Sequence, residues 1–141
     1  MVMATSLLFG ACNSKDIDIE VKVKAKENME NVIGRSDIKV KDGRMTPEVL
    51  WAMGRIGGMN VSPDGQKVVY TVAYYSVPEN RSNREVFVMN ADGTDNKQIT
   101  KTAYSENEAV WIKGGKKIAF LCNESGSSQL WEMNPDGSDR K

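Results

Sequence analysis

The hydrophobic and polar positions from about residue 58 onward follow the spacing of β-strands separated by tight turns. The expected strands lie at about 58–61, 67–76, 84–90, 97–100, 108–112, 117–122 and 129–133. The runs at 68–75 and 118–122 are apolar on both faces, without alternation, which is typical of strands that are covered on both faces. The pattern therefore predicts antiparallel strands that lie between neighbouring layers.

The turn Ser62-Pro63-Asp64-Gly65 leads into the first long apolar run. Pro63 presets the φ angle of the second turn position, Ser62 suits the first, and Gly65 supplies a left-handed residue that closes the turn. These residues predict a hairpin between 58–61 and 67–76.

The strand pattern occurs twice. Residues 65–70 match 115–120 at an offset of 50, and residues 86–93 match 130–137 at an offset of 44. The difference of 6 falls at 77–84, a longer connection than 124–128, and surface hairpins tolerate such added length. Four strands in about 40 to 50 residues is the period of a β-propeller blade.

The predicted fold is all-β, an incomplete β-propeller of about two four-stranded antiparallel blades. The first blade covers about 58–100 and the second about 108–141, with its fourth strand expected after Asp136-Gly137. Open blade faces and edges are unusual in a propeller, because a ring of about four to eight blades covers them. We therefore expect the chain to be the N-terminal piece of a longer protein.

Residues 13–44 form a charged linker that contains no aromatic residue. Apolar and charged residues alternate at 17–24, which fits either a half-buried strand or a solvated segment. A second short strand is expected at 37–40.

A short helix is predicted within 45–57. Thr46 suits the N-cap, Pro47 the first helical position, and Glu48 the positive end of the helix. Apolar residues at 49, 50 and 53 form a stripe, which indicates a packing element that leads into the blades.

Composition excludes several kinds of chemistry. The chain has 19 basic and 19 acidic residues, so it offers no net positive field for nucleic acid. It has no histidine, which excludes Ser-His-Asp and Cys-His catalysis and most zinc sites within it. Cys12 and Cys122 are far apart, without CxxC spacing, and Cys122 is expected to be a small buried hydrophobe. We predict no catalytic, cofactor-binding or metal-binding residue.

Other polar motifs have structural explanations. Residues 90–95 resemble a calcium loop but lack the EF-hand order and its final glutamate, so turn chemistry explains them. The carboxylates of Asp95, Glu106 and Glu108 have no predictable partner. The tryptophans at 51, 111 and 131 are assigned to the core.

The N-terminus resembles a bacterial lipoprotein signal over residues 1–12. Small and apolar residues at 2–11 end at Cys12, whose thiol would carry the lipid, although no basic residue precedes them. Residues 13–18 are similar to the Lys-then-acidic tag of surface-exposed lipoproteins in some Gram-negative bacteria. The resemblance implies export to the periplasm or the outer membrane, with membrane attachment only through the lipid, because the apolar stretch is too short to span a bilayer. The alternative is an ordinary buried cysteine.

The repeat resembles the WD40-like propeller repeat of TolB and of prolyl oligopeptidase-family enzymes. Its motifs are Ser62-Pro63-Asp64-Gly65, the segment 86–93 and Gln98-Ile99-Thr100, and the second unit departs from them at Lys113-Gly114-Gly115. Residues 45–56 and the first turn look like the start of the propeller in bacterial dipeptidyl-peptidase five and acylaminoacyl-peptidase-like enzymes.

That narrower resemblance implies a parent serine peptidase with a C-terminal α/β-hydrolase domain, whose propeller restricts access to short peptides. No catalytic residue carries over, because the chain lacks histidine and Ser125-Gly126-Ser127 lacks the first glycine of a nucleophile elbow. Tyr74, Tyr75 and Arg84 flank the longer hairpin, which faces substrate or the hydrolase domain in one interpretation and is purely structural in the other.

Two other functions stay open from the sequence. One is a non-enzymatic TolB-like propeller that acts as a periplasmic protein-binding scaffold. The other is a standalone lipoprotein in which several copies complete one ring.

Overall fold

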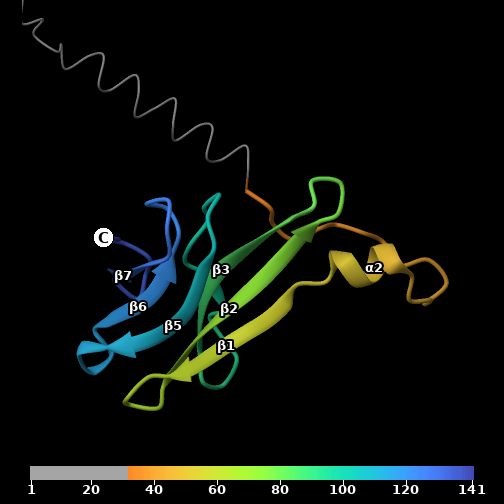
Figure 1. Ribbon diagram of the computed structural model, residues 1–141. Helices are drawn as coiled ribbons and strands as arrows, with labels where there is room; N and C mark the ends of the chain where they lie inside the picture. The colour runs from red at the N-terminus through yellow and green to blue at the C-terminus, as the bar shows by residue number, and fades with distance from the viewer. Residues whose placement is uncertain (1–31) are drawn as a thin grey trace, which may run out of the picture.

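The computed structural model describes residues 32–141, which fold into two antiparallel sheets preceded by one short helix (Figure 1). The elements are α2 (Pro47–Ala52), β1 (Arg55–Val61), β2 (Lys67–Ser76), β3 (Arg81–Asn90), β4 (Lys97–Gln98), β5 (Glu106–Ile112), the 3-10 helix η1 (Lys113–Gly115), β6 (Lys117–Cys122) and β7 (Gln129–Met133). Within these residues, no helix has the length and apolar character that a membrane span requires.

Strand order follows the chain in both sheets, as in the blades of a propeller. The first sheet has the order β1-β2-β3-β4 and the second the order β5-β6-β7. Strands β1 and β5 lie against each other, and α2 lies beyond the start of β1, on the side away from the second sheet (Figure 1). The predicted all-β, incomplete propeller is therefore confirmed.

The second sheet begins a fourth strand where the repeat expects one. The amide of Lys141 donates to the carbonyl of Glu132 at 3.0 Å, and the amide of Glu132 donates back at 2.8 Å. In the first sheet, Lys97 pairs with Val88 in β4 and β3, at an offset of 44 from Lys141 and Glu132. The hydrogen bonding between the third and fourth strands of the first blade is therefore repeated at the equivalent residues of the second blade.

The turns at Asn90 and Asn134 repeat each other bond for bond. The Asn90 amide donates to the Thr94 carbonyl at 2.9 Å, and the Thr94 amide and hydroxyl donate to Asp92 Oδ1 at 2.9 and 2.6 Å. Asn134, Asp136 and Ser138 make the equivalent bonds. Asp92 Oδ1 thus accepts hydrogen bonds from its own turn, and these turn interactions account for the calcium-like motif at 90–95.

Both innermost strands carry a β-bulge at the same place in the repeat. The register of β1 against β2 shifts between Ile56 and Met59, and that of β5 against β6 shifts between Asn107 and Val110. Glu108 lies in the second bulge with φ 52°. Bulges increase the local twist of a strand, so the same bend is built into both blades.

The turn at residues 62–65 forms as its sequence predicts. The Gly65 amide donates to the Ser62 carbonyl at 2.8 Å, and Gly65 has φ 71°. The Ser62 hydroxyl donates to Asp64 Oδ1 at 2.6 Å and accepts from the Lys67 amide at 2.9 Å. In the second sheet the equivalent connection, between β5 and β6, is the 3-10 helix η1, in which Gly114 and Gly115 both have positive φ.

The helix α2 is shorter than the expected 45–57. The Thr46 hydroxyl accepts a hydrogen bond from the Val49 amide at 3.3 Å, and the backbone turns extended at Met53. A Cβ at Gly54 would lie 2.7 Å from a methyl group of Val72, so only glycine allows the chain to pass so close to β2. Of the predicted apolar stripe only Val49 is buried, whereas Leu50 and Met53 are exposed.

Two further predictions concern the segment before the helix. The strand expected at 37–40 is wrong: residues 32–40 have no regular secondary structure, since no neighbouring strand pairs with them. The signal at 1–12, Cys12 and the alternating segment at 17–24 lie outside the described residues.

The core lies between the two sheets. Its buried members come from both sheets: Val69, Val86, Val88, Ala109, Trp111, Ile118, Phe120, Cys122 and Met133. The central strand β2 is buried on both faces, as its apolar run predicts, with Val69 and Tyr70 at 0% and 8% exposure. Tyr70 also stacks on Phe87 and donates a hydrogen bond to Asn96 on the face away from the second sheet.

Asn60 of β1 and Trp111 of β5 join the two innermost strands. Asn60 Oδ1 accepts a hydrogen bond from the Trp111 amide at 3.0 Å, and the Asn60 carbonyl accepts one from the Trp111 indole at 3.1 Å. Trp111 is only 9% exposed, so water is largely excluded from its side of these bonds. One polar residue thereby fixes how the second blade lies on the first.

We predict that Asn60→Ala lowers the free energy of unfolding by about 1–3 kcal/mol, because the Trp111 amide loses its partner in a largely buried position. Urea denaturation measures the change. Gln129→Ala, at an exposed position of β7, is the matched control and should change stability by less than about 0.5 kcal/mol. Equal stability of the two variants would show that the bond does not hold the blades together.

Candidate functional site

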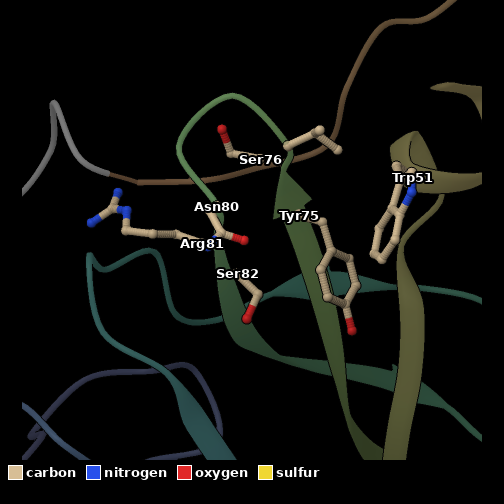
Figure 2. A pocket seen from close by; sticks show the side chains of 7 residues that line it. Trp51, Tyr75, Ser76, Asn80, Arg81 and Ser82 are labelled. Atoms are coloured by element: carbon tan, nitrogen blue, oxygen red, sulfur yellow. The ribbon is translucent and has the colours of Figure 1, made fainter.

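An open cavity of about 400 Å³ lies at the end of the first sheet, where the longer hairpin joins β2 to β3 (Figure 2). The helix contributes one wall, and β2 and the hairpin contribute the rest. The lining residues are Trp51, Tyr75, Ser76, Val77, Asn80, Arg81 and Ser82.

The apolar wall of this cavity consists of two aromatic rings that hold an arginine. Trp51 and Tyr75 meet edge to face, with centroids 5.4 Å apart and an interplanar angle of 64°. The guanidinium of Arg55 lies 4.7 Å from the Trp51 ring and 4.6 Å from the Tyr75 ring. The prediction that Trp51 belongs to the core is wrong, since it is 40% exposed, whereas Trp111 is buried and Trp131 packs against the core.

The polar wall comes from the hairpin itself. Arg81 pairs with Glu79 at 2.8 Å, and Asn80 takes the left-handed turn conformation with φ 49°. Ser82 lies directly opposite Tyr75 in the ladder between β3 and β2. The residues that line the cavity include no histidine, cysteine, aspartate or glutamate.

The structure separates the three residues that were expected beside this hairpin. Tyr75 lines the cavity, but Tyr74 points to the opposite face, where burial raises the pKa of its hydroxyl. Arg84 lies two residues beyond Ser82 on β3, on the same face as Tyr75. Sequence reasoning missed Arg55 and Trp51, because only the fold brings the helix against β2.

A second polar cluster is buried at the junction of the two sheets. Glu85 and Glu106 are both fully buried, and Arg140 pairs with Glu106 at 2.8 Å. Glu85 accepts hydrogen bonds from the Thr100 hydroxyl at 2.7 Å and the Thr102 amide at 3.0 Å. No pattern in the sequence predicts this cluster, in which Glu106 has a definite partner, Arg140.

Burial is the main cause of the raised pKa values of the two carboxyls in this cluster. Desolvation raises the pKa of Glu106 to about 7, and the nearby charge of Glu85 adds to the rise while Arg140 opposes it. Burial likewise raises the pKa of Glu85. Asn83 donates to Glu85 at 2.7 Å, Thr102 donates to Glu106 at 2.9 Å, and the Cys122 thiol lies 3.8 Å from Glu106. Neither carboxyl has solvent-exposed surface, and we therefore interpret the cluster as a structural element.

The remaining candidate residues are also structural. Cys122 is 1% exposed, as predicted, and Asp95 pairs with Lys97 at 2.8 Å. Glu108 is exposed on the β5 bulge. Within residues 32–141, no group of three metal-ligating side chains is close enough to hold an ion.

Two curated relatives match the sequence. The chain is 40% identical over 97 residues to dipeptidyl-peptidase 5 of Porphyromonas endodontalis, which is 69% of this chain and 14% of that enzyme. It is 45% identical over 86 residues to dipeptidyl-peptidase 5 of Porphyromonas gingivalis, which is 61% of this chain and 13% of the enzyme. The chain therefore spans about one seventh of the length of these relatives. No protein-family model matches it.

Among solved structures, TolB from Acinetobacter baumannii matches 60% of this chain and 20% of its own chain, with a TM-score of 0.50 and 24% identity. This likeness concerns the fold alone and agrees with blades of a TolB-type propeller. Together the comparisons confirm the resemblance that the repeat and residues 45–56 indicate.

We predict that the stability of the chain falls as pH rises from about 4.5 to 7. The folded state holds the Glu106 proton more tightly than the unfolded state, so the stabilisation is complete below the unfolded pKa and is lost as pH rises through about 7. Glu106→Gln should flatten this slope, which is on the order of 1–3 kcal/mol across the window. Urea denaturation at pH 5 and pH 8 measures it.

The exposed Glu108→Gln variant is the control and should keep the wild-type slope. The exposed aspartates, whose pKa values are lowered by their turns, act only below about pH 4 and do not disturb this window. An unchanged slope in Glu106→Gln would contradict the assignment.

Proposed function

Because the chain is similar to dipeptidyl-peptidase 5 and folds as TolB-type propeller blades, we propose that it is the N-terminal propeller part of an exported serine exopeptidase or oligopeptidase. The observation that carries this proposal is the identity of 40% and 45% to two enzymes of that one name. The chain contributes no histidine, so the reacting imidazole would belong to a hydrolase domain outside these residues.

In this proposal the propeller gates access to the hydrolase domain. Its blades stack through a packed core and the Asn60–Trp111 bonds, which would keep the ring narrow enough to exclude folded proteins. Short peptides would pass, and the open cavity beside Trp51 and Tyr75 would be one surface that they meet. The partners would be short peptides and the protein's own C-terminal hydrolase domain.

A TolB-like binding scaffold is the weaker candidate. The likeness to TolB is 24% identity and supports the blade fold, without bearing on what the blades bind. The likeness to the peptidases is stronger in sequence over a similar share of the chain.

We predict that the whole protein containing this chain hydrolyses a dipeptidyl chromogenic substrate, whereas the 141-residue chain alone does not. Substitution of the serine in a downstream Gly-x-Ser-x-Gly motif should lower kcat by a factor of about 10³ or more. Steady-state assays with the purified protein provide the measurement. Absence of hydrolysis by the whole protein would favour the scaffold.

The gate itself is tested in the same protein with a short peptide and a long one. Asn60→Ala should raise kcat/KM for the long peptide relative to the short one, because the junction between the first two blades loosens. Gln129→Ala should leave the ratio unchanged. A ratio equal in both variants would contradict gating by these blades.

We also propose that the parent is a lipoprotein of the periplasm or the outer membrane, anchored through Cys12. The support is the sequence of residues 1–18, which lies outside the described part. Cys12→Ser should move the protein from the membrane fraction to the soluble fraction of a Gram-negative host and remove a lipid-sized mass from the mature N-terminus. An unmodified Cys12 inside the mature wild-type chain would overturn the proposal.

A further inference from the structure

We propose that Arg55 and Arg84 form a carboxylate-binding site on the first sheet, beside the Trp51–Tyr75 cavity. The occupant would be the carboxylate of a short peptide, and this identification of the ligand rests on the proposed function. The site itself rests on the placement of the two arginines.

Arg55 and Arg84 lie on one rung of the sheet and on one face of it. Arg55 of β1 pairs with Ala73 of β2, and Ala73 pairs with Arg84 of β3. Residues directly opposite each other point to the same face, so the two arginines flank Ala73, with backbones about 10 Å apart. Ala73 has the small side chain that leaves room between them.

The two guanidinium groups border the same stretch of this face. The Arg55 group is held against the Trp51 and Tyr75 rings, at 4.7 and 4.6 Å from their centroids. The Arg84 group reaches back across β2, since a Cβ on Gly57 would lie 2.5 Å from its Nη1 atom. Gly57 is two residues from Arg55 along β1, so the Arg84 group extends over the strand that carries Arg55.

Neither arginine has a carboxylate partner among residues 32–141. The ion pairs in this part of the chain are all made by other basic residues, at positions 81, 97, 113, 117, 140 and 141. Two unneutralised guanidinium groups on one face repel each other, and an anion between them removes that repulsion. Each guanidinium presents a planar fork of donors that matches a carboxylate.

A buried hydroxyl points to the same place. Thr71 lies two residues from Ala73 on the same face of β2 and is 1% exposed, and its Oγ1 has no hydrogen-bond partner in the described structure. Like Arg84 Nη1, this oxygen lies 2.5 Å from the Cβ position of Gly57. Buried hydroxyls normally have a partner. A bound anion that draws Arg84 toward Arg55 would expose this donor to the ligand.

The surroundings favour a peptide as the source of the carboxylate. The cavity next to Arg55 offers aromatic walls at Trp51 and Tyr75 and polar groups at Asn80 and Ser82. A peptide whose carboxylate lies between the arginines would place its neighbouring side chain against these rings. The chain as a whole has zero net charge, so attraction of anions to this face would come from the two arginines and not from a general positive field.

The test measures binding of acetyl-leucyl-alanine, with a free carboxylate, to the full chain by isothermal titration calorimetry. The carboxyl-terminal amide of the same peptide and inorganic phosphate are the comparison ligands. We expect Arg55→Gln and Arg84→Gln each to weaken binding of the free peptide about tenfold. Arg84→Lys keeps the charge without the fork and should fall between Arg84→Gln and the wild type.

Arg44→Gln, at an exposed arginine outside both sheets, is the matched control and should bind as the wild type does. Circular dichroism of each variant establishes that it is folded. The amide should bind at least about tenfold more weakly than the free peptide, because it lacks the charge.

Equal binding of the peptide and its amide, or an equal loss in Arg44→Gln, would overturn the proposal. Tighter binding of phosphate than of the peptide would overturn the assignment to a carboxylate. No step of this experiment requires hydrolysis. Failure of the carboxylate site would therefore show as lost binding, and failure of the proposed peptidase function would show only in the hydrolysis assay.

Discussion

The structure depends on one constraint: both faces of the four-stranded sheet carry apolar side chains, and each face needs another element packed against it. The first sheet meets this requirement on one side through Val69, Val86 and Val88, which pack against residues of the second sheet. On the other side Tyr70 stacks on Phe87 within the same sheet, and Val49 of α2 lies toward Val72 and Tyr74. The central strand β2 is therefore buried on both faces, and the two sheets pack against each other over one shared core.

Packing covers much of each blade face in such a fold, so surface that is free for binding lies mainly toward the ends of the strands. The Trp51–Tyr75 cavity and the arginine pair both lie at the end of the first sheet, where β2 and β3 extend into a hairpin that the second sheet does not match in length. The longer connection expected at 77–84 is wrong, because the loop 77–80 is shorter than 123–128 and the extra residues lengthen β2 and β3 themselves.

The sequence predicts the strands, the turns and the repeat, because these depend on neighbours along the chain. Pro63 and Gly65 favour their turn through their own backbone preferences, and the turn of Asn90 recurs at Asn134 with Asp136 and Ser138 in the places of Asp92 and Thr94. Contacts between elements are beyond such reasoning: Asn60 and Trp111 are 51 residues apart, and nothing local marks Glu106 as the partner of Arg140. Trp51 was misplaced for the same reason, since an apolar residue on a short helix is buried only if another element covers it.

The two bonds between Asn60 and Trp111 also bear on how blades find their neighbours. Apolar contacts between similar blades carry little directional information, because the hydrophobic effect depends on the area buried and not on orientation. Asn60 accepts two hydrogen bonds from Trp111, one with its side chain and one with its backbone carbonyl. A displacement of one blade along the other would break both bonds and leave a buried donor of Trp111 unpaired. Polar residues at blade junctions would then determine which blade packs against which, and so fix the order of otherwise similar repeats around a ring.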